Sequence, residues 1–128
     1  MVKIKIENVN PKNKKTADCV IRAISTASGK DYWEVVDDLV AMYKKTGYEM
    51  TTKQCYEKVL DKYGFSKYSQ PRKRDNTKYL VGEIDQVLPR NAKKVVISMA
   101  NHLTCYDGES IVDIWDCRNK TIGNYYVI

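Results

Sequence analysis

Lys15-Thr16-Ala17-Asp18-Cys19-Val20-Ile21-Arg22-Ala23-Ile24 joins a polar loop to an apolar helix, and the cysteine stands at the junction. Thr16 or Asp18 can cap this helix, and Gly29 is placed to end it. Apolar side chains cover most of the helix circumference, which predicts that it is largely buried. Cys19 then lies in the first turn, where backbone N–H groups lack helical partners and the dipole is positive. A thiolate is stabilised there, and the thiolate is the nucleophilic form of cysteine.

Two further helices are predicted in the first half of the chain. Asp31 and Glu34 have the spacing of a capping box and open a helix that ends at Gly47. Thr51 and Gln54 repeat that spacing and open a helix that ends at Gly64. The apolar faces expected are Trp33, Val36, Leu39, Val40 and Tyr43 in the second helix, and Tyr56, Val59, Leu60 and Tyr63 in the third.

The second half changes to the alternation that is typical of strands. Strands are predicted at 95–99, 102–106, 111–115 and 125–128, with another at 2–7. Asp107-Gly108 indicates a tight hairpin turn. Residues 65–78 are expected to form a connector that has room for a short strand, and 79–88 one more helix. Helices followed by an antiparallel sheet predict an α+β fold, and 128 residues suit a single domain covering 1–128.

Composition limits the classes of partner and cofactor. The net charge of +6 permits contact with nucleic acid or an acidic protein without identifying either. The chain has no apolar run long enough to span a membrane and no signal-peptide pattern, so we expect a cytoplasmic protein with reduced thiols. No CxxC or HxxxH pair is present, so neither a metal nor another cofactor is expected. Two groups of basic residues are candidate binding residues: Lys12, Lys14 and Lys15, and Arg72, Lys73 and Arg74. The simpler interpretation is that these charges are only solvated.

Nucleophilic catalysis is suggested by the order of three residue types. His102 is the only histidine, and it begins a predicted strand. If the sheet packs on the Cys19 helix, the imidazole can exchange a proton with the thiol. A carboxylate would orient the imidazole. Asp116 is preferred because Trp115 beside it would shield the contact from water, and Asp113 on the same strand is the alternative. Arg22 is expected to pair with Asp18 or another carboxylate and to have a structural role.

These motifs resemble those of the small papain-like cysteine peptidases. The likeness is carried by Thr16-x-Asp18-Cys19-x-x-Arg22-Ala23 and by His102-Leu103-Thr104, followed by Asp113-x-Trp115-Asp116. It is closest to short proteins of bacteria, phages and prophages, and more distant to the bacteriocin-leader peptidases. The resemblance implies a helix-on-sheet fold with Cys19 as nucleophile, His102 as general base and then acid, and Asp116 as the orienting group. Larger members carry an oxyanion-binding glutamine before the cysteine. This chain has none, and Asn13 is the expected substitute.

The resulting prediction is a thiol-dependent hydrolase or acyltransferase that acts on an amide bond of a peptide or protein through a thioester intermediate. The alternative is a catalytically inactive papain-like module from a phage or mobile element. Such a module would bind a host protein or nucleic acid through Lys15, Arg72, Lys73 and Arg74. A purely structural domain is a third possibility.

Overall fold

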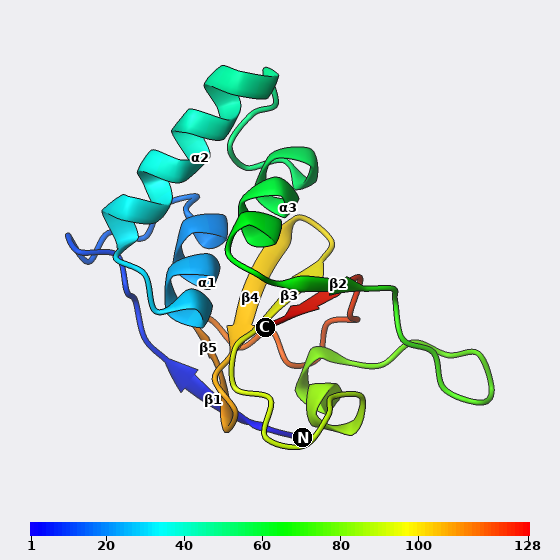
Figure 1. Cartoon of the computed structure of the whole chain (residues 1–128). Coiled ribbons are helices and arrows are strands. Elements are labelled where there is room, and N and C mark those ends of the chain that lie inside the picture. The colour runs from blue at the N-terminus through cyan, green and yellow to red at the C-terminus, as the bar shows by residue number, and fades with distance from the viewer.

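The computed structural model describes residues 1–128 as an α+β fold built on one six-stranded sheet, which confirms the predicted α+β class. The sheet is mixed and not purely antiparallel as predicted, because the N-terminal strand joins its edge in parallel. The strand order is β1-β5-β4-β3-β6-β2. β1 pairs with β5 in parallel, and all other neighbours are antiparallel. Figure 1 shows the three α-helices gathered on one side of this sheet. The bounds are β1 Lys3–Ile6, α1 Cys19–Ser28, α2 Tyr32–Thr46, α3 Lys53–Lys62, β2 Ser66–Tyr68, the 3-10 helix η1 Val81–Gln86, β3 Val95–Met99, β4 His102–Tyr106, β5 Ser110–Asp113 and β6 Tyr125–Val127.

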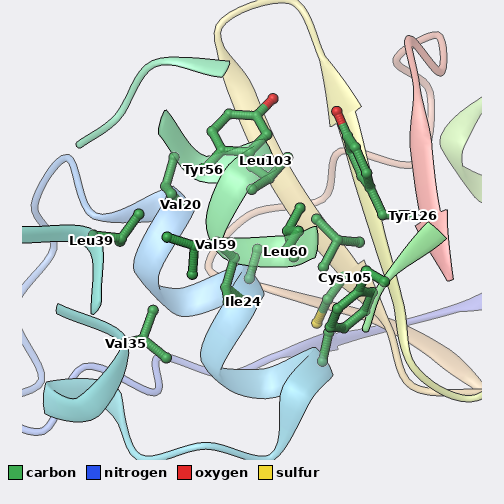
Figure 2. Close-up of a cluster of buried hydrophobic side chains, with 14 of the residues drawn as sticks. Val20, Ile24, Val35, Leu39, Tyr56, Val59, Leu60, Leu103, Cys105 and Tyr126 are labelled. Atoms are coloured by element: carbon green, nitrogen blue, oxygen red, sulfur yellow. The ribbon is translucent and has the colours of Figure 1, made fainter. Parts of the chain in front are cut away.

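The helical layer packs on the sheet through a core of 16 buried residues. Ile24 of α1, Leu60 of α3 and Tyr126 of β6 are among its largest fully buried side chains. Figure 2 shows them meeting between the helices and the strands. Because α1 is buried against β4, the end of α1 that carries Cys19 is held beside the end of β4 that carries His102.

A second core of 11 buried residues covers the opposite face of the sheet. Val95 and Ile97 of β3 point into this second core, whereas Val96 between them joins the helical core. This is the side-to-side alternation of a strand that is buried on both faces. Val81 and Ile84 of η1 cover the second face, with the segment that leads into β6.

Three details of the predicted elements are wrong. Helix α2 buries Tyr32, Val35 and Leu39, whereas Trp33 and Tyr43 of the predicted face are exposed. The predicted helix at 79–88 is only the short 3-10 turn η1, because its backbone is tied to the segment before β6. The capping box predicted for Thr51 and Gln54 is not formed, since Thr52 is the residue before α3 and no side chain caps this helix. The tight turn predicted at Asp107-Gly108, by contrast, does connect β4 to β5.

The other helix boundaries agree with the sequence. Gly29, Gly47 and Gly64 all adopt the left-handed conformation just beyond a helix, which residues with a side chain seldom adopt. The Asp31 side chain accepts a hydrogen bond from the Trp33 backbone at 3.0 Å, as a helix cap does. None of the helices has both the length and the apolar character required to cross a membrane.

Candidate active site

Cys19 is the first residue of α1 and the only one of four cysteines that is not fully buried. All four thiols are free. Cys55, Cys105 and Cys117 are at most 1% exposed. The position predicted for Cys19 is therefore confirmed. The residue is half-buried and lies at the positive end of a ten-residue helix.

His102 is placed by a tight turn between β3 and β4. Met99 and His102 are paired across the two strands, so Ala100 and Asn101 form a two-residue connection. Asn101 has a φ of 56°, which asparagine tolerates better than most residues. His102 thus begins its strand at the rim of the sheet, where it is mostly but not fully buried. The Trp115 ring lies against the imidazole at a centroid distance of 5.0 Å.

Asp113 is the carboxylate that contacts the histidine. Its Oδ2 lies 2.6 Å from His102 Nε2. The register pairs Cys105 with Val112, so Asp113 lies on the same face of the sheet as His102, diagonally across the strand pair. The preference for Asp116 as the orienting residue was wrong on this geometry. Asp116 lies past the end of β5, is exposed, and forms a two-pronged ion pair with Arg118.

Arg22 connects the helix that carries Cys19 to the strand that carries Asp113. Its Nε donates to Asp18 Oδ1 at 2.7 Å, and its Nη1 donates to Asp113 Oδ1 at 3.1 Å. Arg22, Asp18 and Asp113 are 6%, 4% and 2% exposed. The expected pairing of Arg22 with Asp18 is confirmed, and the contact with Asp113 extends it to the sheet. The residue before Cys19 and the partner of His102 are therefore held by one guanidinium.

Further hydrogen bonds satisfy both carboxylates. Asp18 Oδ2 accepts from the Tyr32 hydroxyl at 2.8 Å and from Asn10 at 3.0 Å. Asp113 Oδ1 also accepts from the Ile114 backbone at 2.7 Å. Asp18 consequently does not cap α1 with its side chain. The N–H groups of the first turn of α1 remain without that partner, beside the sulfur.

Proton affinities in this cluster favour a thiolate–imidazolium pair. Burial alone would lower the pKa of His102, but hydrogen bonds with Asp113, Cys117 and Cys19 raise it to about 11. Burial alone would raise the pKa of Cys19. Hydrogen bonds from His102 and the Leu103 backbone, with the charges of His102 and Arg22, lower it instead. Because Nε2 is bound to Asp113, Nδ1 is the ring nitrogen left to share a proton with Cys19.

Cys117 is a member of the cluster that sequence reasoning missed. Its sulfur lies 3.6 Å from Asp113 Oδ2 and is fully buried. One ligand atom each from His102, Asp113 and Cys117 lies within 4.8 Å of the other two, which is the spacing of a small metal site. Two neighbours compete with a cation for these ligand atoms, since Arg22 already pairs with Asp113 and His102 Nε2 shares a hydrogen bond with the same carboxylate. We therefore interpret Cys117 as a thiol donor to the carboxylate.

A cavity of about 480 Å³ opens beside the sulfur. Its walls come from the start of α1, the start of α3, and the β3–β4 turn. Cys19 and His102 are both part of this lining. The lining residues are Ala17, Cys19, Val20, Thr51, Lys53, Tyr56, Ser98, Met99, Asn101, His102 and Leu103. The cavity has no carboxylate in its lining, and a compound placed in it would meet both the Cys19 sulfur and the His102 ring.

The other predicted site residues lie elsewhere. Asn13 sits on the exposed loop before α1 with a φ of 51°, and it does not line the cavity. The expectation that its amide replaces the oxyanion glutamine is therefore not supported by its position.

The predicted basic binding residues do not form one surface. Lys15 is exposed on the loop before α1. Arg72 donates to the Asn76 backbone oxygen, and Lys73 pairs with Glu83 at 3.1 Å, whereas Arg74 has no ion-pair partner. The segment that carries Arg72, Lys73 and Arg74 projects from the opposite side of the molecule from the Lys15 loop (Figure 1). None of these four residues lines the cavity beside Cys19.

A spectroscopic titration tests the predicted charge state of Cys19. Absorbance near 240 nm reports thiolates, and the difference between wild type and Cys19→Ser isolates this one. We expect the difference signal to persist well below pH 9, the usual pKa of a cysteine. In His102→Gln the signal should appear only at higher pH, because the imidazolium is lost. An unshifted titration in wild type would contradict the ion pair.

Comparisons with protein-family models, with curated proteins and with solved structures find no match for this chain.

Proposed function

We propose that this chain is a thiol-dependent hydrolase or acyltransferase of the papain-like type, acting on a peptide, isopeptide or related amide bond. The observation that carries the proposal is that His102 bonds Asp113 at 2.6 Å and lines the same cavity as Cys19. The support from the surroundings is that Cys19 begins a helix and borders a cavity.

The proposed reaction begins from the thiolate–imidazolium pair. The Cys19 sulfur adds to the substrate carbonyl carbon, and the carbonyl π electrons move to the oxygen. The tetrahedral intermediate then collapses as His102 donates its proton to the leaving nitrogen and the C–N bond breaks. A thioester remains on Cys19. Water, or an amine in an acyl transfer, attacks this thioester with His102 as the base, and the thiolate is released.

The first experiment measures which thiol reacts. Iodoacetamide is added at neutral pH in substoichiometric amounts, and the alkylated cysteine is identified by mass spectrometry. We expect Cys19 to be modified before the three buried cysteines, because its pKa is lowered and its sulfur borders the cavity. Equal, slow modification of all four thiols would argue against a hydrolase and would favour the binding-module alternative.

The second experiment tests whether a thioester forms on Cys19. 4-Nitrophenyl acetate is an activated acyl donor that needs no particular peptide sequence. We expect release of 4-nitrophenolate together with one acetyl group on Cys19, and neither in Cys19→Ser. Acetylation confined to lysines, at the same rate in wild type and Cys19→Ser, would refute the proposed chemistry.

A further inference from the structure

The proposed reaction places negative charge on the substrate oxygen. One hydrogen-bond donor that can stabilise this charge is evident. The backbone N–H of Cys19 belongs to the first turn of α1, where N–H groups have no helical acceptor. Sites of this kind use at least two donors, and loss of one typically lowers the rate about 10²–10³-fold. A second donor should therefore lie on the wall of the same cavity.

The lining residues narrow the choice of second donor. Ser98 is buried, but its hydroxyl already donates to the Asn124 backbone oxygen and accepts from the Asn124 N–H. Lys53 donates to the Asn124 side chain. Thr51 and Asn101 are exposed, so water competes for any hydrogen bond that their side chains would donate. Apart from His102 itself, Tyr56 is the remaining lining residue with a donor, and it is only 7% exposed.

Tyr56 lies at the correct end of the core. Figure 2 shows its hydroxyl pointing away from the packed side chains. Val20 and Leu103 line the same cavity as Tyr56. Those two residues directly follow Cys19 and His102 in the sequence. The ring is held from behind by an edge-to-face contact with Tyr126 at a centroid distance of 6.3 Å.

The hydroxyl has a proton to donate throughout the working pH range. Burial raises the pKa of Tyr56 to about 12; a hydrogen bond with Tyr126 opposes the shift, and the charges of Glu57 and Cys19 add to it. The Tyr126 hydroxyl donates to Glu57 at 2.6 Å, so its own proton is committed. The Tyr56 hydroxyl can rotate to donate a charge-assisted hydrogen bond to an oxyanion in the cavity that it lines.

We propose that the Tyr56 hydroxyl is the second oxyanion donor of this site, acting with the Cys19 backbone N–H in place of the absent glutamine. This inference rests on the proposed function. The donated hydrogen bond forms as the carbonyl π electrons move to oxygen, and no proton is transferred from Tyr56. When the carbonyl re-forms in the thioester, this hydrogen bond weakens because the oxygen loses its negative charge.

Tyr56→Phe tests the proposal because it removes one oxygen and keeps the buried ring. Two reactions of Cys19 are compared in wild type and in the variant. Acetylation by 4-nitrophenyl acetate passes through an oxyanion, whereas alkylation by iodoacetamide displaces iodide from a CH₂ group and forms none. We expect acetylation to fall about 10²–10³-fold and the alkylation rate to stay within a factor of about three.

Tyr106→Phe is the matched control. Tyr106 is also 7% exposed, but it packs in the core on the opposite face of the sheet. Both rates should equal those of wild type in this variant. Thermal unfolding of the variants, measured in parallel, reports on packing.

The possible outcomes distinguish the donor role of Tyr56 from the proposed hydrolase function. If wild type forms the acetyl thioester and Tyr56→Phe forms it equally fast, Tyr56 is not a donor and the hydrolase proposal stands. If acetylation and alkylation fall together, Tyr56 merely positions Cys19, and the donor role is refuted. If wild type forms no acetyl thioester at Cys19, the hydrolase proposal fails and the Tyr56 inference fails with it.

Discussion

Asp113→Asn should lower the rate of Cys19 acetylation about 10²–10⁴-fold, the range over which a correctly oriented acid–base group contributes. The carboxylate bonds His102 Nε2 at 2.6 Å and is the first of the contacts that raise the pKa of the imidazole. An amide neither attracts the imidazolium charge nor prefers one orientation of the ring. Stopped-flow release of 4-nitrophenolate measures the rate.

The pH profile of the same variant has a predicted direction. In wild type, the active ion pair exists from the lowered pKa of Cys19 up to the pKa of His102 at about 11. Without the negative charge of Asp113, the His102 pKa falls towards its usual 6.5, so the alkaline limit of activity should move to lower pH. A purely structural role of Asp113 would lower the rate without moving that limit.

Asp116→Asn is the matched control, because the two residues lie three positions apart and differ in geometry. Asp116 bonds only Arg118 and its backbone, at the surface. We expect a near wild-type rate and an unchanged pH profile. If Asp116→Asn abolished acetylation and Asp113→Asn did not, the assignment of Asp113 would be refuted.

Arg22→Met should reduce the free energy of unfolding by about 3–5 kcal/mol, the usual result of removing one partner from a buried ion pair. Arg22 is 6% exposed, and its loss leaves Asp18 and Asp113 buried with reduced compensation. Denaturant titration measures the change. Arg118→Met, which breaks the surface pair with Asp116, should leave the midpoint nearly unchanged.

The pH dependence of this stabilisation can be assigned a sign. Contacts with Arg22 and neighbouring donors outweigh burial and lower the pKa of Asp18 below its usual 3.8; contacts led by His102 do the same for Asp113. A carboxylate with a lowered pKa stabilises the fold above its unfolded pKa and loses that contribution as the pH falls through the folded value. The difference in stability between wild type and Arg22→Met should therefore shrink below about pH 4. A difference that stayed constant down to pH 2 would contradict this account.

Arg22→Lys separates stability from positioning. A lysine keeps the positive charge but cannot reach two carboxylates with the planar fork of a guanidinium. We expect part of the stability to return, while the acetylation rate remains below wild type because Asp113 Oδ1 loses a fixed partner. Full recovery of both quantities would show that only the charge matters.

The fold class followed from local patterns because each signal acts over a few residues. The glycines at 29, 47 and 64 could be recognised as helix ends because the positive φ that each adopts is a local property of the backbone. The run of β-branched residues from Val95 to Ile97 likewise predicted a strand without knowledge of its neighbours. The face of α2 was not predicted, because Trp33 and Val35 are both apolar and only the position of α3 and α1 decides which is covered.

Sequence alone determined which cysteine and which histidine would meet at the candidate site. A cysteine at the start of an apolar helix and a single imidazole left few alternatives, and the relevant physics, the helix dipole and the imidazole pKa, is local. Tertiary structure decided the rest. The hairpin register placed Asp113 rather than Asp116 on the histidine, and the packing of α1 and α3 on the sheet brought Arg22, Cys117 and Tyr56 to the site. These contacts join residues up to 91 positions apart, and no short-range pattern encodes a distance of that kind.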